Sequence, residues 1–395
     1  MQSLDGQPGS TPLSFLSPDV RFGDGVAAAL QETLSRYRIR DPLIVTDAGI
    51  ESVGILDRIR DEIDPAATVY HASTEPSTDD FEKLPTEAVD GVVAIGGGSC
   101  IDTAKLAATL LAHGGDPVDY LGVDSVPGPI EPLIAVPTTS GTGSQATQTA
   151  VISHDNVKRG VSDGHLRPDV ALVDPTLTFD LPRSVTARSG FDAFVHALES
   201  LTARDYRWVE SRPITYQGAN PISRALAWRA LQLIHGSLER AVFDGNDRDA
   251  RRSMSLGAHL AGTAFSVSGL GAVHALASTY GGLTGKPHGD CLAASVRTGL
   301  RYNLPVRREQ YGEIARALGV ERDGTPDSIA LIDECDRVRS AIGLPGSVTE
   351  FDLSVADVDD IVTNTLVQDR RLATNPREVR EDIRDVVVDV EFSES

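Results

Sequence analysis

The sequence predicts two successive parts, an α/β part over residues 1–183 and an all-helical part over residues 184–395. In the first part, short apolar runs alternate with segments of helical periodicity. Strand signals stop at Leu181-Pro182, and from Ser184 onward apolar residues recur mostly at helical spacing. A chain of 395 residues, 41% of them hydrophobic, is long enough to bury a large core.

The expected elements follow from these patterns along the chain. Residues 1 to about 12 are rich in Gly, Ser and Pro, and we expect them to fray or to form an edge hairpin. In the first part, helices are predicted over 26–37 and from Cys100 to about His113, and strands at 42–46, 90–95, 133–136, about 148–153 and 170–174. In the second part, helices are predicted at about 184–202, 221–243, 247–267, 271–281, 289–302, 308–318 and 326–341, with weaker ones after Val355.

The charge of the chain argues against several classes of partner. Its formal net charge of −21 would repel a polyanion, so we expect neither nucleic acid nor an anionic membrane surface as a partner. Lysine is nearly absent, and every other cationic side chain is an arginine; the lysines are Lys83, Lys105, Lys158 and Lys286. Together with the acidic surplus, this bias indicates either a halophilic protein adapted to high salt or an acidic protein from a GC-rich genome.

The cysteines and the N-terminus predict a cytoplasmic protein. Cys100, Cys291 and Cys335 are scattered without the spacing of a metal site, a redox motif or a disulfide framework. The chain begins without a charged segment followed by an apolar core, and no apolar run approaches membrane length. We therefore expect a reducing compartment and no membrane partner.

Three strand ends carry residues suited to binding a nucleotide. Asp47 follows the strand at 42–46 and is equally suited to bind ribose hydroxyls or to cap the next helix. Gly96-Gly97-Gly98-Ser99 joins a strand to a helix and predicts a phosphate cradle, the alternative being a tight turn capped by Ser99. The run from Pro137 to Ser144 offers hydroxyls and glycines to a nucleotide, or is a low-complexity loop.

Asp192 and His196 stand four residues apart in a helical pattern, so both side chains project from one helix face. A carboxylate and an imidazole one turn apart can hold one metal ion. His274 and His288, each in its own distinctive setting, would complete an Asp-His-His-His set with room for a substrate oxygen. Taken singly, each His is more often a hydrogen-bonded core residue than a ligand.

These motifs together resemble the iron-containing alcohol dehydrogenase family, also called group III. The matching segments come in the family's order and span roughly residues 40 to 300. They are Gly96-Gly97-Gly98-Ser99 with Asp102 and Lys105, Pro137-Thr138-Thr139 with Gly141-Thr142-Gly143-Ser144, Asp174-Pro175, Gly190-Phe191-Asp192-Ala193 with His196, Asn220-Pro221-Ile222-Ser223, and Pro287-His288-Gly289.

The resemblance implies a two-domain, dehydroquinate synthase-like plan. A Rossmann-like domain over 1–183 would bind NAD or NADP, and an all-helical catalytic domain over 184–395 would bind one divalent metal, with the active site in the cleft between them. The implied metal ligands and catalytic residues are Asp192, His196, His274 and His288. Fe²⁺ is the first expectation for the metal, with Zn²⁺ or Mn²⁺ as alternatives, because an N3O ligand set does not choose among them.

The resemblance also assigns residues to the cofactor. Asp47 would meet the adenosine ribose, and its carboxylate favours NAD because it repels a 2′-phosphate. Gly97, Gly98 and Ser99 would hold the pyrophosphate. The other implied contacts are Thr138 and Thr139 on the adenine side, Lys158 at the ribose near the nicotinamide, Leu177 packed by the cofactor, and Asp102 and Ser144 in the same cofactor set.

The function implied is that of a metal-dependent, NAD(P)-linked alcohol dehydrogenase or aldehyde reductase. The metal would act as a Lewis acid on the substrate oxygen while the nicotinamide donates or accepts hydride. The substrate would be a small alcohol, aldehyde or hydroxy acid. Because relatives commonly pair, we expect a homodimer or a higher homo-oligomer.

The chain departs from the family pattern at two places, and the second of them points to a runner-up function. Many members have a His four residues after the third ligand, where this chain has Ser278. The loop over 211–219 and the run Ser189-Gly190-Phe191-Asp192 resemble the hydroxyacid-oxoacid transhydrogenase branch of the family. Arg212 in that loop could select a carboxylate, although a surface ion pair is the more common role of such an arginine.

The long insertion of the animal transhydrogenase between the third and fourth ligands is missing, so transhydrogenation ranks second. A metal-dependent lyase or cyclase is less expected, because so few lysines are available for a phosphorylated substrate. A non-catalytic nucleotide-binding protein is also less expected, since all four ligand positions carry ligating residues.

Overall fold

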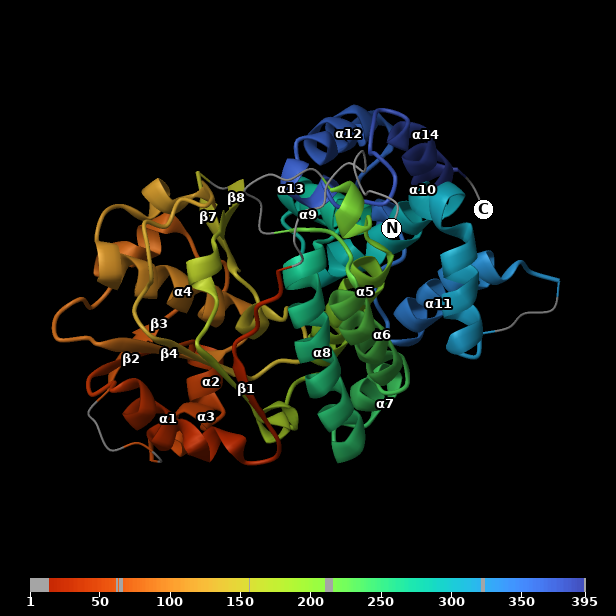
Figure 1. Cartoon of the computed structure of the whole chain (residues 1–395). Coiled ribbons are helices and arrows are strands. Elements are labelled where there is room, and N and C mark those ends of the chain that lie inside the picture. Colours follow the sequence, from red (N-terminus) through yellow and green to blue (C-terminus); the bar gives the residue numbers. More distant parts are fainter. Residues whose placement is uncertain are drawn as a thin grey trace, which may run out of the picture.

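The computed structural model describes residues 14–61, 63, 67–155, 157–209, 216–320 and 324–393. Its first half contains a parallel sheet with the order β3-β2-β4-β6-β9-β1 (Figure 1). The strands are β1 (Asp19–Phe22), β2 (Pro42–Thr46), β3 (Thr68–His71), β4 (Gly91–Gly96), β6 (Leu133–Pro137) and β9 (Val170–Val173). The expectation for residues 1 to about 12 lies outside the described residues.

The central strands β2, β4 and β6 are buried along their whole length. Alternate residues point to opposite faces of a strand, so continuous apolar runs fit a sheet that is covered on both sides. Leu43, Val92 and Ala94 pack against α4 (Gly98–His113) on one face. Ile44 and Val93 pack on the other face, which is covered by α1 (Leu30–Tyr37), α2 (Ala48–Ser52) and α3 (Ile55–Arg60).

The order of the strands reverses direction at β2. β3 lies on one side of β2, whereas β4 and the later strands β6 and β9 lie on its other side. In an open parallel sheet, ligands bind outside the carboxyl ends of the strands at such a reversal of order. Asp47 follows β2 and Gly97 follows β4, so both predicted nucleotide-binding positions lie at this point.

A small second sheet has the order β5-β8-β7, with β5 (Gly122–Val123), β7 (Thr149–His154) and β8 (Val157–Ser162). β7 and β8 form an antiparallel hairpin, and β5 pairs with β8 in parallel. The strand predicted at about 148–153 is therefore present, but it belongs to this hairpin and not to the main sheet. The sequence analysis did not predict β1, β3, β5 or β8.

The second half is helical, as the sequence predicted. Its helices are α5 (Arg183–Thr202), α6 (Pro221–His235), α7 (Leu238–Phe243), α8 (Arg248–Ser268), α9 (Ala272–Thr284), α10 (His288–Ala317), α11 (Asp327–Ala341), α12 (Val358–Leu366), α13 (Asp369–Leu372) and α14 (Ile383–Val387). In the described residues, no single helix is long and apolar enough to cross a membrane. α8 and α9 reach that length only together, as a pair bent by 99°.

Two helix predictions were wrong in their boundaries. The segment 221–243 contains a break at Gly236-Ser237 and forms two helices. The segments 289–302 and 308–318 form the single helix α10, which continues through Pro305. Proline normally interrupts a helix because it lacks an N–H group. Here Leu300 and Tyr311, on either side of it, are buried in the same core, and this packing keeps α10 continuous.

The loop after β6 joins the two halves by close backbone contacts. Gly143 has a φ of +65°, and a Cβ atom there would lie 2.5 Å from Cα of Gly262 on α8. A Cβ at Gly141 would lie 2.5 Å from Cβ of Ser189 on α5. Only glycine allows contacts this short. The loop from Thr138 to Ser144 is therefore fixed between the sheet and the helices of the second half.

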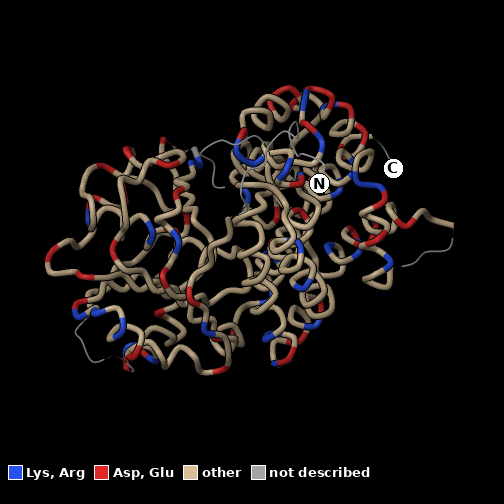
Figure 2. The backbone as a smooth tube through the Cα atoms, viewed as in Figure 1, with Lys and Arg blue, Asp and Glu red and all other residues tan. Residues whose placement is uncertain are grey.

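Acidic and basic residues are intermixed around the outside of both halves (Figure 2). The chain as a whole carries the acidic surplus.

Candidate active site

Three helices bring the four predicted metal ligands together. Asp192 and His196 lie one turn apart on the buried face of α5, His274 lies in the first turn of α9, and His288 is the first residue of α10. Nε2 of His274, His196 and His288 lie 3.3, 3.5 and 3.7 Å, respectively, from Oδ1 of Asp192. The side chain of His288 is 40% exposed, whereas the other three are buried, so His288 marks the open side of the cluster.

The arrangement fits one metal ion. Donor atoms bonded to the same ion at about 2.1 Å lie roughly 3 to 3.5 Å apart. The separations around Asp192 are close to this range, and the ligand atoms of Asp192, His196 and His274 all lie within 4.8 Å of one another. Three imidazole nitrogens and one carboxylate oxygen form a set that binds iron, zinc or manganese.

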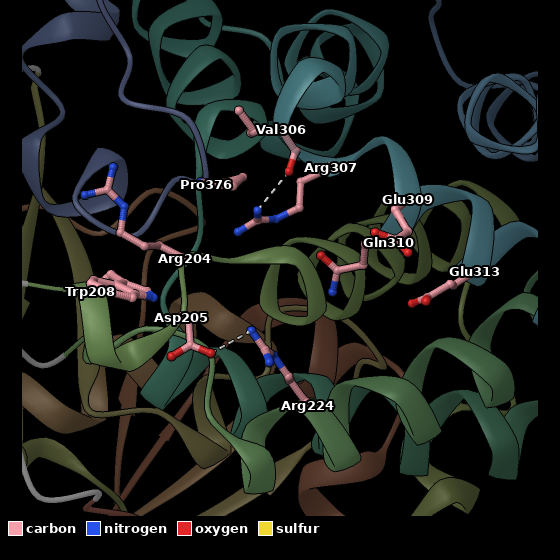
Figure 3. A pocket seen from close by; sticks show the side chains of 10 residues that line it. All are labelled: Arg204, Asp205, Trp208, Arg224, Val306, Arg307, Glu309, Gln310, Glu313 and Pro376. Atoms are coloured by element: carbon pink, nitrogen blue, oxygen red, sulfur yellow. Dashed lines mark hydrogen bonds and ion pairs between the residues drawn. The ribbon is translucent and has the colours of Figure 1, made fainter. Parts of the chain in front are cut away.

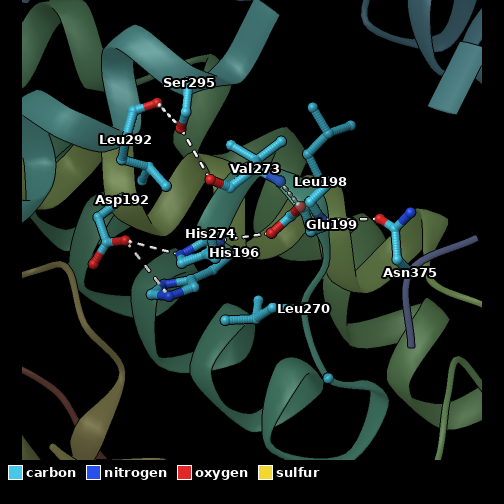
Figure 4. A network of polar contacts seen from close by, with 12 residues as sticks. Asp192, His196, Leu198, Glu199, Leu270, Val273, His274, Leu292, Ser295 and Asn375 are labelled. Carbon is cyan, nitrogen blue, oxygen red and sulfur yellow. Dashed lines mark hydrogen bonds and ion pairs between the residues drawn. The ribbon is translucent and has the colours of Figure 1, made fainter. Parts of the chain in front are cut away.

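Glu199 orients the ring of His274 (Figure 4). Oε2 of Glu199 lies 2.6 Å from Nδ1 of His274, and Oε1 accepts a hydrogen bond of 2.9 Å from the backbone N–H of Val273. A carboxylate only accepts hydrogen bonds, so Nδ1 carries a proton, and Nε2 is the nitrogen that faces Asp192 and is placed to bind a metal ion. The sequence analysis missed Glu199, although it follows Asp192 and His196 at positions i, i+4 and i+7 on one helix face.

The electrostatics of the cluster keep two imidazoles available as ligands. Burial lowers the pKa of His196 to about 3, and the loss of water around the partly exposed ring of His288 lowers its pKa to about 4, so both rings are neutral at neutral pH. Burial opposes ionisation of Asp192, but the neighbouring imidazoles, His196 foremost, hold its pKa below the usual value. Burial also opposes the charge on His274, but its hydrogen bonds to Asp192 and Glu199 raise its pKa.

Two contacts missed by the sequence analysis hold the ligands in place. The ring of Phe265 stacks on His196 with centroids 4.2 Å apart and planes 20° apart. Arg188 forms two hydrogen bonds of 2.8 Å to the two oxygens of Asp290. Arg188 precedes Asp192 by one turn and Asp290 follows His288 by two residues, so this bidentate pair fixes the start of α10 against α5.

The glycine turn is built as a cradle at the N-terminus of α4. Gly97 is the N-cap residue of this 16-residue helix, and Gly98 is its first residue. A Cβ at Gly98 would lie 2.7 Å from Cγ2 of Thr142, so only glycine lets the first turn of α4 approach the loop after β6. The Ser99 hydroxyl donates to the carbonyl of Thr74 at 2.8 Å. The first turn of a helix presents free N–H groups and a partial positive charge to an anion.

Thr138 and Asp47 flank this cradle. The backbone N–H of Thr138 donates to the carbonyl of Gly96, while its buried hydroxyl finds no hydrogen-bond partner among the described residues. Such a hydroxyl usually has a partner, and a bound nucleotide would supply one. Asp47 caps α2 by accepting from the N–H of Ile50 at 2.9 Å. The capping role is thus present, and the ribose contact stays a prediction.

Other predicted cofactor residues are engaged elsewhere. Oδ1 of Asp102 accepts from the Ser144 hydroxyl at 2.5 Å, and Oδ2 accepts from the N–H of Val151 at 2.9 Å. Lys158 on β8 forms an ion pair of 2.8 Å with Glu75, and both side chains are about half exposed. Leu177 is buried in the core beneath α1–α3. The structure therefore gathers Gly97, Gly98, Ser99, Thr138 and Thr139 at the cradle and leaves Leu177 in the core.

The two departures from the family pattern lie only partly within the described residues. Arg212 and the rest of 210–215 lie outside the described residues. Ser278 lies one turn after His274 on α9. A separate cavity of about 650 Å³ is lined by Arg204, Arg224 and Arg307 among others, and by none of the predicted site residues (Figure 3). Within it Arg307 donates to the carbonyls of Thr202 and Ala203 at the end of α5, so it has a structural role there.

A glycine turn at a helix N-terminus, joined by a closely packed loop to an Asp-His-His-His cluster, is the arrangement expected of an enzyme that uses a nucleotide and a metal ion. Residues 17–175 match the family described as iron-containing alcohol dehydrogenase, and residues 186–389 match the C-terminal domain of the Fe-containing alcohol dehydrogenase family. The chain belongs to the iron-containing alcohol dehydrogenase family and is an oxidoreductase. The family and the two-part fold predicted from the sequence are thereby confirmed.

Curated relatives and solved structures match nearly the whole chain. The NAD-dependent methanol dehydrogenase of Bacillus methanolicus is 33% identical, over 92% of this chain and 95% of its own length. The mitochondrial hydroxyacid-oxoacid transhydrogenase of Bos taurus is 31% identical, over 91% of this chain and 85% of its own length. The structure of an alcohol dehydrogenase from Oenococcus oeni is 32% identical, with a TM-score of 0.87 over 95% of this chain and 99% of that one.

Proposed function

We propose that this chain transfers a hydride between a nicotinamide cofactor and a small alcohol or aldehyde, with one divalent metal ion acting as Lewis acid on the substrate oxygen. One observation carries the proposal. Three imidazole Nε2 atoms lie 3.3 to 3.7 Å from a single carboxylate oxygen of Asp192. The loop next to the glycine cradle contacts α5, which carries Asp192 and His196, through Gly141, and it contacts α8 through Gly143, so a nucleotide at the cradle would lie beside that cluster.

The predicted metal ligands and Glu199 have separate roles in this proposal. Asp192, His196, His274 and His288 would hold the ion, with the partly exposed His288 on the side where a substrate oxygen enters. Glu199 keeps the proton of His274 on Nδ1, so Nε2 stays free to bind the ion. The buried walls of the cluster exclude water, which strengthens the electrostatic contacts inside it.

For the cofactor we propose NAD in preference to NADP, with Gly97, Gly98 and Ser99 at the pyrophosphate. The support for NAD is the carboxylate of Asp47, which would repel a 2′-phosphate. Thr138 and Thr139 are proposed on the adenine side and Lys158 at the ribose near the nicotinamide. Asp102, Ser144 and Leu177 would act through the loop and core that they hold together. Fe²⁺ is the proposed metal, and Zn²⁺ and Mn²⁺ are alternatives for the same donor set.

The test is an assay of purified protein with NADH or NADPH and short aldehydes, before and after removal of metal by a chelator. We expect NADH oxidation that is lost on chelation and restored by a divalent ion, with NADH preferred to NADPH. Protein that binds neither metal nor nucleotide would contradict the proposal and would indicate a non-catalytic protein.

Transhydrogenation is the second candidate, supported by the likeness to the Bos taurus transhydrogenase. In that reaction a hydroxy acid reduces the bound cofactor, and an oxo acid reoxidises it. Turnover that needs both acids together and no added cofactor would favour it. Turnover of a single alcohol with free NAD would favour the dehydrogenase.

We also propose the domain boundaries, the salt adaptation, the cellular location and the assembly of the enzyme. We divide the chain into a nucleotide-binding domain, 1–183, and a metal-binding domain, 184–395. The net charge of −21 and the scarcity of lysine support adaptation to high salt. A cytoplasmic location fits three free, buried cysteines. A homodimer is proposed for the assembly, and size measurement in solution at several salt concentrations tests it.

A further inference from the structure

Arg371 lies in the short helix α13, which connects the small sheet to the metal-ligand helices. The neighbouring Arg370 bonds to the hydroxyl of Ser162 on β8 and stacks over the ring of Tyr216 at 5.3 Å. On the other side, the hydroxyl of Thr374 donates to the carbonyl of Leu270 at 2.8 Å. Figure 1 shows α13 between β8 and α9. These contacts attach the segment to β8 on one side and to the loop between α8 and α9 on the other.

The end of this segment touches the residues that support His274. Oδ1 of Asn375 accepts from the N–H of Ala272, at the start of α9, at 2.9 Å. A Cβ on Gly271 would lie 2.5 Å from Oδ1 of Asn375 and 3.1 Å from Oε1 of Glu199. These short distances place the segment that carries Arg371 directly beside the Glu199–His274 pair.

The guanidinium of Arg371 is half-buried and has no charged partner among the residues that the structure describes. Its side-chain hydrogen bond goes to the neutral amide oxygen of Gln368 at 2.6 Å, and it forms no ion pair with the described residues. Its positive charge adds to the effect of burial in lowering the pKa of His288. Burial lowers the pKa of Arg371 itself, and the negative charge of Glu199 opposes that shift. Arg371 thus lies within electrostatic range of both the fourth predicted ligand and Glu199.

The charges around the cluster leave a positive surplus. Asp192 and Glu199 are the acidic groups in contact with the imidazoles, and together they balance one divalent ion. Glu199 already uses both oxygens, one toward Val273 and one toward His274, so it is not free to pair with Arg371. The nearby Lys158 is paired with Glu75. A half-buried guanidinium is stabilised by an anion that accepts its hydrogen bonds, so Arg371 offers a binding site for an anionic group.

We propose that Arg371 binds the anionic end of the substrate, so that the site selects alcohols and aldehydes that carry a carboxylate at the far end of a short carbon chain. The inference rests on the proposed function and names its substrate class. The reacting oxygen would lie at the metal ligands, and the carboxylate would receive the two-pronged hydrogen bonds that a guanidinium offers.

The test compares two four-carbon aldehydes, succinate semialdehyde and neutral butyraldehyde, in the metal-loaded enzyme with NADH. The measured quantity is the ratio of the two kcat/KM values. We expect wild type to favour the semialdehyde, Arg371→Gln to lower the ratio about 10–100-fold, and Arg371→Lys to recover part of it. Arg370→Gln is the matched control, because Arg370 contacts β8 and Tyr216, and it should leave the ratio as in wild type.

A binding measurement makes the test independent of turnover. Succinate, which carries the carboxylate but no reactive carbonyl, is titrated calorimetrically into wild type, Arg371→Gln and Arg370→Gln. Binding weakened about 10–100-fold only in Arg371→Gln supports the proposal. Equal succinate affinity in all three proteins, or a substrate ratio untouched by Arg371→Gln, overturns it. Absence of turnover with every aldehyde refutes the proposed function instead, and the succinate titration still decides the role of Arg371.

Discussion

Replacing Glu199 by Gln tests how the metal site is held, because it keeps the shape of the side chain and changes only its hydrogen-bonding capacity. The carboxylate accepts two hydrogen bonds, one from Val273 N–H and one from Nδ1 of His274. An amide has a single acceptor oxygen, so its NH₂ group must face one of the two donors. Either the N–H of Val273 loses its partner, or His274 moves its proton to Nε2, where that proton blocks the metal.

Leaving a buried donor unpaired costs about 1–3 kcal/mol. Metal ligands that lose their supporting hydrogen bond typically lose affinity by about 10–100-fold. We therefore expect Glu199→Gln to weaken metal binding by this factor. The assay is a competition between the metal-free enzyme and a chromophoric chelator, with the metal dissociation constant as the result.

Glu334→Gln is the matched control. Glu334 is a second buried glutamate hydrogen-bonded to an imidazole, with Oε1 2.9 Å from Nε2 of His235, and it belongs to α11 and not to the metal cluster. This variant should keep the metal affinity of wild type. If Glu199→Gln also binds metal as tightly as wild type, Glu199 does not orient His274, and the role that we assign to this hydrogen bond is wrong.

Three further predictions concern the same structure. His274→Ala should abolish metal binding and activity while keeping the helical circular dichroism spectrum, and a fully active variant would contradict the ligand assignment. Arg188→Gln removes the bidentate contact to Asp290, so metal should dissociate several-fold faster in stopped-flow chelation; an unchanged rate would show that this pair does not hold His288. Hydrogen bonds to His235 and Arg337 outweigh burial and lower the pKa of Glu334 to about 2, from the value of 4.5 for a free glutamate. The stabilisation, at most on the order of 3 kcal/mol and reduced by solvent screening at the half-exposed Arg337, is therefore fully present above pH 4.5 and is lost as pH falls toward 2. Unfolding of wild type and Glu334→Gln at pH 7 and pH 3.5 should give a difference that shrinks at the lower pH, and a difference independent of pH would refute the linkage.

Local sequence signals were sufficient for the parts of the fold that are buried along their length. β2, β4 and β6 are apolar throughout, and the ligand face of α5 repeats at helical spacing. The edge strand β3 is exposed or half-buried at each of its residues. An edge strand of this kind does not need a continuous apolar run, and the sequence Thr68–His71 has none. It is a strand because Ile44 and Val45 of β2 supply its hydrogen-bonding partners, which no local pattern reveals.

The contacts between distant segments were also beyond the sequence. Nothing near Pro305 predicts that α10 continues through it, since the stabilising packing comes from both flanks within one core. Arg371 follows the predicted ligands by more than 80 residues and approaches them only after the chain has folded. A sequence pattern can identify ligands on one helix, whereas the contacts of Glu199 with His274 and of Arg188 with Asp290 join residues on different elements.

Asp102, Lys105 and Ser144 illustrate how a motif can serve a site without touching the ligand. Nζ of Lys105 donates to the Ser144 hydroxyl at 2.9 Å, to Oγ1 of Thr147 at 3.0 Å and to the carbonyl of Thr149 at 2.7 Å. Burial lowers the pKa of Lys105 to about 8, although nearby Asp102 opposes the shift. A buried charge is tolerated only when its hydrogen bonds are satisfied. The group therefore ties α4, which begins at the cradle, to the loop that ends at Gly143, and the contact of Gly143 with Gly262 carries that constraint to α8. Because these links are short, the fold sets the position of the predicted nucleotide cradle relative to α8, whose Phe265 stacks on His196.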